Sequence, residues 1–116
     1  MQKRCLRNGK KSTEYKIKIA EEFLEEFDEI CEYISINLKS PQASNLLRQK
    51  VINKVLLLKK APKIFAKIKK FSKTKKQYRR IIINNYVIVY TIDEKEKIVY
   101  IAHIYYGQRN YIDNLL

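Results

Sequence analysis

The stretch that decides the fold runs from Tyr78 to Tyr106 and reads "YRRIIINNYVIVYTIDEKEKIVYIAHIYY". It contains three apolar runs rich in isoleucine, valine and tyrosine, and these residues favour strands. Asn84-Asn85 tolerates the positive φ of a tight hairpin turn, and Asp93 to Lys97 provides a second turn. The stretch therefore predicts an antiparallel meander of three strands. Because its runs are apolar on both faces, we expect helices on one face and another cover, such as a partner, on the other.

Upstream of this meander, "EYKIKI" (Glu14 to Ile19) alternates charged and apolar side chains and predicts a short first strand. The apolar positions that follow take the three-and-four spacing of an amphipathic helix. They are Ala20, Phe23, Leu24, Phe27, Ile30, Cys31, Ile34 and Leu38. Seven acids are expected on and around the outer face of this helix: Glu21, Glu22, Glu25, Glu26, Asp28, Glu29 and Glu32.

A second helix is predicted after the break "NLKSPQ", with Ser40 as N-cap and Pro41 at the first helical position. It should continue to about Lys60, and Pro62 should enforce its end. The two helices then form a hairpin. Residues 63–77 predict an irregular connection that apolar anchors pin to the core. The expected anchors are Ile64, Phe65, Ile68 and Phe71.

The resulting element order is β-α-α-β-β-β, which indicates an α+β fold: an N-terminal strand, a two-helix hairpin and a three-strand meander. "GQRNYIDNLL" (Gly107 to Leu116) closes the chain as a loop or short helix. Residues 14–116 are expected to form a single domain. Residues 1–13 form a basic arm that we expect to be flexible and dispensable for folding, because it offers almost no apolar surface.

Charge is distributed in blocks along the 116 residues, whose formal net charge is +13. Residues 19–38 carry seven acids and no base, whereas residues 39–80 carry fifteen Lys/Arg and no acid. Mixed signs are the usual solution to solubility, so an acid-free stretch of this length indicates a polyanionic partner, either nucleic acid or an acidic protein.

Several other classes of protein are excluded by the sequence. No apolar run approaches the roughly 20 residues that a membrane-spanning helix needs, and the basic N-terminus lacks the apolar core of a secretory signal. A cytoplasmic protein with no membrane partner is therefore expected. Cys5 lies in the polar arm and Cys31 in the helical pattern, so a disulfide between them is not expected. The absence of any Cys/His ligand group, phosphate loop or Ser/His/Asp set predicts no metal, no cofactor and no small-molecule substrate.

From Tyr78 to the end, "YRRIIINNYVIVYTIDEKEKIVYIAHIYYGQRNYIDNLL" resembles the C-terminal half of the RelE/ParE superfamily of bacterial type II toxins. In that superfamily a strand that opens Tyr-Arg leads to a hairpin, and the last strand ends in a Gly-x-Arg-x-Tyr/Leu tail. The resemblance in order and motif runs from about Tyr15 to Leu116. It implies a growth-inhibiting toxin, of the kind linked to plasmid stabilization, that a cognate acidic antitoxin neutralises.

The resemblance leaves two targets open, because the superfamily divides mainly into DNA gyrase poisons and ribosome-dependent mRNA endonucleases. Arg109 aligns with an arginine that follows the last strand in RelE-like nucleases. However, those nucleases also carry an arginine directly after the tyrosine of the middle strand, where this chain has Val87. Their tails also tend to end in a tyrosine or histidine, whereas this chain ends in Asn114, Leu115 and Leu116. The leading interpretation is therefore a non-enzymatic ParE-like poison of gyrase, with the endonuclease as the alternative.

Under the leading interpretation, the residues expected to contact the target are Arg79, Arg80, Arg109 and Tyr111, and the lysines of residues 63–76 give electrostatic approach. A glycine turn at Gly107 would present Arg109, whose guanidinium can hold phosphate in a fork. Strand alternation sends Arg79 and Arg80 to opposite faces, so only one of them can meet a given ligand.

Under the endonuclease interpretation, the catalytic candidates are the same four residues together with His103, the only histidine. RNA cleavage needs a base, a cation for the phosphorane and an acid for the leaving oxygen. A lone mid-strand histidine is also compatible with a purely structural role. Two further alternatives stay open: a non-catalytic, basic nucleic-acid-binding module, and an inactive descendant of the toxin superfamily.

Overall fold

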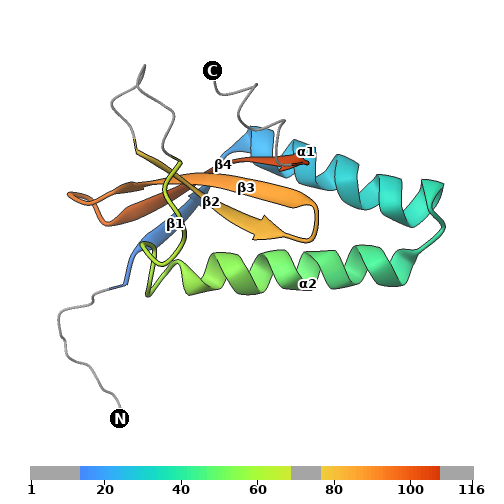
Figure 1. The fold of residues 1–116 in the computed structure, drawn as a ribbon, viewed down its shortest axis with the longest axis horizontal. Coiled ribbons are helices and arrows are strands. Elements are labelled where there is room, and N and C mark those ends of the chain that lie inside the picture. Colours follow the sequence, from blue (N-terminus) through green and yellow to red (C-terminus); the bar gives the residue numbers. More distant parts are fainter. Residues whose placement is uncertain (1–13, 69–76, 108–116) are drawn as a thin grey trace, which may run out of the picture.

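The computed structural model describes residues 14–68 and 77–107 of the chain. Its elements are β1 (Lys16–Ile19), α1 (Glu21–Glu32), a π-helical turn η1 (Tyr33–Asn37), α2 (Pro41–Leu57), β2 (Tyr78–Ile83), β3 (Tyr86–Asp93) and β4 (Ile98–Tyr106). Figure 1 shows the two helices running antiparallel as a hairpin beside the sheet. The α+β fold and the element order expected from the sequence are confirmed.

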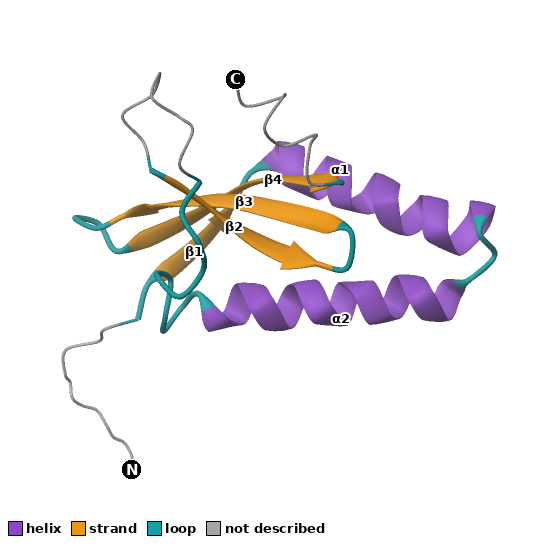
Figure 2. Cartoon of the chain, in the orientation of Figure 1, coloured by secondary structure: helices purple, strands orange, loops and turns teal. Residues whose placement is uncertain are grey.

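The sheet has the spatial order β1-β4-β3-β2. β2, β3 and β4 form the expected antiparallel meander (Figure 2), and β1 lies parallel to β4 on its other side. Asn84 has a φ of 54° in the first turn, as its position in a tight hairpin requires, and Gly107 has a φ of 86° directly after β4. The N–H of Gly107 donates to the carbonyl of Asn85 at 2.6 Å, so this glycine closes the end of the sheet.

α1 buries Phe23, Phe27 and Cys31, which lie four residues apart and therefore on one side of the helix. Glu21 and Glu22 in its first turn interact favourably with the helix dipole. One continuous helix was expected as far as Leu38, but the last turns widen into η1. η1 ends at Asn37, and Lys39 takes a φ of 51° in the turn that leads to α2.

α2 begins as the sequence predicts. The Ser40 side chain accepts a hydrogen bond from the N–H of Ala43 at 3.3 Å, and Pro41 follows at the first helical position. The helix ends at Leu57, slightly before the expected Lys60, and a turn leads to Pro62. The carbonyl of Pro62 accepts a hydrogen bond from the buried hydroxyl of Tyr90 at 2.6 Å, which fixes the start of the connection to the sheet.

The connection after Pro62 is irregular as far as Ile68, the last residue described before the gap, and it forms a short bridge with β2. The N–H of Ile68 donates to the carbonyl of Tyr78 at 2.8 Å. Ile68 is buried and Phe65 packs against the core, as expected of anchors. The anchor role expected for Ile64 is wrong, because this side chain is 58% exposed. Phe71 lies outside the described residues.

The core divides between the two faces of the sheet. The larger cluster joins the helices to one face and includes Phe27, Leu47 and Val51 with Ile88 and Ile101. The smaller cluster, on the opposite face, consists of Ile68, Val87 and Val89, with Tyr78 and Tyr105 packed against it. The expectation that the central strands are covered on both faces is therefore confirmed for β3. Among the described residues, no helix is long and apolar enough to span a membrane.

Candidate functional site

Arg79 and Arg80, the two candidate arginines of β2, lie on opposite faces of the sheet. Arg79 pairs with Tyr90, which belongs to the core on the helix side, whereas Arg80 pairs with Val89, which belongs to the smaller cluster. Because paired residues in adjacent strands point to the same side, the two guanidinium groups diverge. The alternation expected from the sequence is thus present.

Arg79 holds the connection between α2 and β2. Its Nη1 donates to the carbonyl of Lys63 at 3.1 Å and to the carbonyl of Phe65 at 2.8 Å. Charge-assisted hydrogen bonds of this kind are stronger than neutral ones. The Arg79 guanidinium therefore has a structural role in fixing the connection to β2. Arg80 is the candidate arginine on the opposite face of the sheet.

His103 is tied to α1 by a carboxylate. Its Nδ1 lies 3.2 Å from Oε2 of Glu26, and Oε1 of the same carboxylate accepts a hydrogen bond from the N–H of Ile104 at 3.0 Å. The imidazole ring stacks on Tyr105 with 5.4 Å between ring centroids. Both side chains of the pair are about one-third exposed, at 32% for His103 and 31% for Glu26. A partly accessible Glu–His pair can orient a histidine, but it also has a structural explanation as a fastening between α1 and β4.

Glu26 was expected among the solvated acids of α1, and this expectation is wrong. The side chain turns to the sheet because Glu26 follows Phe23 by three residues and precedes Ile30 by four. This spacing places Glu26 next to the apolar face of the helix, so the signal was present in the sequence. In the turn between β3 and β4, Asp93 Oδ1 accepts hydrogen bonds from the N–H groups of Lys95 and Glu96, both at 3.1 Å.

Val87 stands where RelE-like nucleases carry an arginine, and it is fully buried in the smaller cluster. Its cross-strand neighbours are Ile82 on β2 and Tyr105 on β4. A guanidinium at this position would have to displace apolar packing and would lie away from water. The packing of this face of the sheet therefore requires an apolar residue such as Val87 where the nuclease pattern has arginine.

Arg109 and Tyr111, the candidates in the tail, lie outside the described residues. The described chain reaches Gly107, whose left-handed backbone conformation accounts for the choice of glycine there. The positive φ of Gly107 fits the glycine turn expected there, while the roles of Arg109 and Tyr111 stay predictions.

A basic, apolar surface covers the exposed side of α2, and we call it the α2 surface. Its apolar members are Leu46 (63% exposed), Ile52 (47%), Leu56 (50%) and Leu57 (47%). The helix also carries Arg48, Lys50 and Lys54 and contains no acid; Lys50 is exposed, Lys54 is half-buried, and Arg48 lies on the flank beside α1. Large exposed apolar side chains that are grouped with one sign of charge are typical of an interaction surface.

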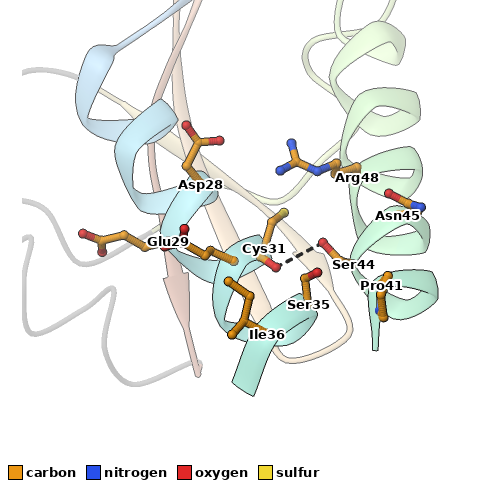
Figure 3. A pocket seen from close by; sticks show the side chains of 10 residues that line it. Asp28, Glu29, Cys31, Ser35, Ile36, Pro41, Ser44, Asn45 and Arg48 are labelled. Carbon is orange, nitrogen blue, oxygen red and sulfur yellow. Dashed lines mark hydrogen bonds between the residues drawn. The ribbon is translucent and has the colours of Figure 1, made fainter. Parts of the chain in front are cut away.

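A cleft lies between α1 and α2 near the hairpin turn, with a volume of about 510 Å3. Figure 3 shows Asp28 and Cys31 from α1 facing Arg48 from α2. The hydroxyl of Ser44 donates to the carbonyl of Cys31 at 3.1 Å, which joins the two helices. Burial raises the pKa of the Cys31 thiol, so this buried cysteine is a packing residue rather than a reactive one. Within residues 14–68 and 77–107, no group of three or more His, Cys, Asp or Glu side chains could hold a metal ion.

Residues 17–111 match the family model described as the ParE toxin of the type II toxin–antitoxin system parDE. The chain belongs to this family. No curated protein matches the sequence of this ParE-family toxin. Solved structures do match its fold. The isolated RelE toxin of E. coli has a TM-score of 0.57 at 14% identity, over 88% of this chain and 99% of that one.

A second similar structure is the archaeal RelE–RelB complex from Pyrococcus horikoshii OT3, with a TM-score of 0.52 and 18% identity. The match covers 84% of this chain and 99% of that chain. At such low identity these likenesses establish the shared fold. The resemblance to the RelE/ParE superfamily and the role of a type II toxin are thus confirmed for this ParE-family protein.

Proposed function

We propose that this protein arrests growth by poisoning DNA gyrase and that a cognate acidic antitoxin neutralises it. The observation that carries the proposal is the match to the ParE toxin model over residues 17–111. The buried Val87 supports it, because the RelE-like cleavage site needs a phosphate-binding cation at that position of the sheet. Arg79 also supports it, because its guanidinium donates hydrogen bonds to two backbone carbonyls and so has a structural role rather than a role in binding phosphate.

The antitoxin is the proposed partner of the α2 surface. A helix or extended segment with acidic and apolar side chains would neutralise Arg48, Lys50 and Lys54 while covering Leu46 and Leu56. The archaeal RelE–RelB complex from Pyrococcus horikoshii is a precedent for such a complex in a protein of this fold. Covering this surface would remove apolar area from water and give most of the binding free energy.

A ribosome-dependent mRNA endonuclease is the second candidate, and the Glu26–His103 pair is the observation that favours it. A carboxylate that holds Nδ1 leaves Nε2 as the nitrogen for proton transfer. On this reading, His103→Gln should abolish mRNA cleavage on translating ribosomes. If the protein is a gyrase poison, the same substitution should leave growth arrest intact.

The proposal is tested by inducing the protein alone and together with the small acidic reading frame that we expect beside its gene. Expression alone should stop growth within a few generations, and co-expression should restore it. A variant with Leu46→Glu and Leu56→Glu should still stop growth but should escape rescue, because the antitoxin would face repulsion. Normal growth on expression of the intact, folded protein would overturn the toxin assignment.

A further inference from the structure

We propose that a pocket lined by three tyrosines binds a lysine or arginine side chain from a basic segment of a protein partner. The pocket has a volume of about 530 Å3 and lies where the end of α1 meets the end of β4. We call it the tyrosine pocket. It is lined by Glu29, Ile30, Tyr33, Leu38, Tyr86 and Tyr106. None of these residues belongs to the α2 surface, so the inference does not depend on the antitoxin site proposed there.

Three aromatic rings converge on the tyrosine pocket from separate elements. Tyr86 and Tyr106 are cross-strand partners whose ring centroids lie 5.3 Å apart with an edge-to-face angle of 65°. Tyr33 is the first residue of η1 and follows Glu29 by one helical turn, so both side chains reach the pocket from the same side of the helix. Tyr33 is 55% exposed and Tyr106 is 59% exposed. About half or more of each of these residues is therefore exposed to solvent at the pocket.

The phenol groups of these tyrosines are close enough to influence one another. Burial raises the pKa of Tyr86, and smaller contributions in the same direction come from Tyr106, Cys31 and Tyr33. The pocket therefore disfavours negative charge on Tyr86. A cation would have the opposite effect on these phenols, because its positive charge is attracted to ring faces and hydroxyl oxygens.

The electrostatics around the tyrosine pocket select the sign of its ligand. Residues 19–38 carry seven acids and no base, and one of these acids, Glu29, lines the pocket. The next base along the chain, Lys39, is not among the lining residues. An acidic helix beside aromatic rings attracts ammonium and guanidinium groups and repels phosphate. The ligand is therefore a basic protein segment and not a nucleic acid.

The chain already uses pairing between cations and aromatic rings elsewhere. Lys97 Nζ lies 5.0 Å from the ring centroid of Tyr15, Arg48 Cζ lies 5.5 Å from that of Phe27, and Lys54 Nζ lies 5.8 Å from that of Phe65. All three contacts fall within the roughly 6 Å over which such pairs attract. Aromatic rings of this protein therefore have cations at ordinary contact distances, and the tyrosine pocket offers an external cation the same interaction with an added carboxylate.

The partner is expected to enter the pocket with a side chain rather than by adding a strand to β4. β1 pairs with β4 only from Ile98 to Ile101. Beyond that point, the carboxylate of Glu26 accepts the hydrogen bond from the N–H of Ile104. An added strand would need this N–H as a donor. Capping of this N–H protects the edge from strand addition. A cationic side chain can still reach the pocket, because it needs no backbone group of β4.

The test is fluorescence anisotropy with the purified full-length protein and a fluorescein-labelled peptide of alternating lysine and glycine. A second peptide has every lysine acetylated, which removes the charge and keeps the chain length. We expect the lysine peptide to bind at least about tenfold more tightly than the acetylated one. Equal binding of the two peptides would overturn the proposal, since the pocket would then recognise apolar surface alone.

Variants locate the binding within the protein. Tyr33→Leu should weaken binding about three- to tenfold, whereas Tyr33→Phe keeps the ring and should bind like the wild type. Tyr100→Leu removes an exposed tyrosine outside the pocket and is the matched control. Glu29→Gln should weaken binding more than Glu25→Gln, which makes the same charge change on an exposed position of α1 that does not line the pocket. Thermal unfolding of each variant verifies that the fold is intact.

Three further outcomes would contradict the proposal. If Glu25→Gln weakens binding as much as Glu29→Gln while Tyr33→Leu has no effect, the peptide senses only the charge of α1. If Tyr33→Leu abolishes a concentration-dependent dimer seen by sedimentation, the occupant is a second copy of the chain. If the peptide binds only after deletion of residues 1–13, the occupant is the basic segment of the chain itself.

Discussion

Oε1 of Glu26 lies 3.0 Å from the backbone nitrogen of Ile104 and accepts its hydrogen bond, so a side chain of α1 completes the hydrogen bonding of β4. The second oxygen of the same carboxylate lies 3.2 Å from His103 Nδ1. One residue thereby fastens the helix to the sheet beyond the point where β1 ends. It also closes an edge that would otherwise be open to strand pairing.

Replacement of Glu26 should reveal this fastening. Glu26→Ala removes the acceptor for the Ile104 N–H and should lower the free energy of unfolding by about 1–2 kcal/mol in urea denaturation. Glu25→Ala, at an exposed position one residue earlier, should change it by less than about 0.5 kcal/mol. Equal effects of the two substitutions would contradict the role assigned to Glu26.

Tyr90→Phe should destabilise the protein through the connection after α2. The substitution removes the 2.6 Å hydrogen bond to the carbonyl of Pro62 and leaves this buried acceptor unpaired, at a cost of about 1–2 kcal/mol. Chemical denaturation at neutral pH measures the loss. A fully stable Tyr90→Phe variant would show that the bond contributes nothing net.

Alkaline pH should also weaken the fold through Tyr90. Burial raises the pKa of Tyr90 to about 12, although the positive charge of Arg79 acts in the opposite direction. The unfolded chain releases this proton near its ordinary value of about 10, so the folded state binds more protons between pH 10 and 12. Stability is therefore fully present below about pH 10 and is lost as pH rises towards 12. Tyr90→Phe should show a shallower loss over this window than the wild type.

Val87→Arg is expected to destabilise the protein strongly, by about 3 kcal/mol or more, because Val87 is fully buried. We therefore do not expect it to restore nuclease activity, although it replaces the arginine of the RelE-like pattern. Ile82→Arg is the matched control: Ile82 pairs with Val87 on the same face but is 42% exposed. Thermal unfolding should separate the two variants clearly, and a stable Val87→Arg protein would contradict the packing described for this face.

The order of elements was predictable because each local signal agreed with the final fold. Ser40 and Pro41 mark the start of α2, Asn84 takes the positive φ of its turn, and the strands follow their apolar runs. The parallel pairing of β1 with β4 was not predicted, because pairing of distant segments depends on the whole fold. The π-helical turn was also missed, since its residues continue the same apolar spacing as α1.

The candidate site was less predictable, because a residue type does not reveal which partner it meets. Arg79 looked like a phosphate ligand but bonds to two carbonyls of a neighbouring connection. In the tyrosine pocket, Tyr33 precedes Tyr86 by more than fifty residues in the sequence. Only folding brings Tyr33 beside Tyr86 and Tyr106. Glu26 could have been found, because its helical spacing already placed it next to the apolar face.

The α2 surface can be tested by direct binding of the antitoxin. Leu46→Glu places a negative charge in a basic, apolar region and should weaken antitoxin binding by about tenfold or more, measured by calorimetry. Ile64→Glu makes the same change at a residue that is also exposed but lies in the connection, and it should bind normally. Weakening by Ile64→Glu alone would move the interface away from α2.

The most direct test of the central claim is a supercoiling assay with purified gyrase and relaxed plasmid DNA. The same preparations are added to translating ribosomes, where mRNA ends are mapped. We expect the intact protein to inhibit supercoiling and leave mRNA whole, and Arg109→Ala to lose most of the inhibition because it removes a guanidinium that we propose contacts the target. Unimpaired supercoiling together with mRNA cleavage at the ribosome would contradict the assignment as a gyrase poison.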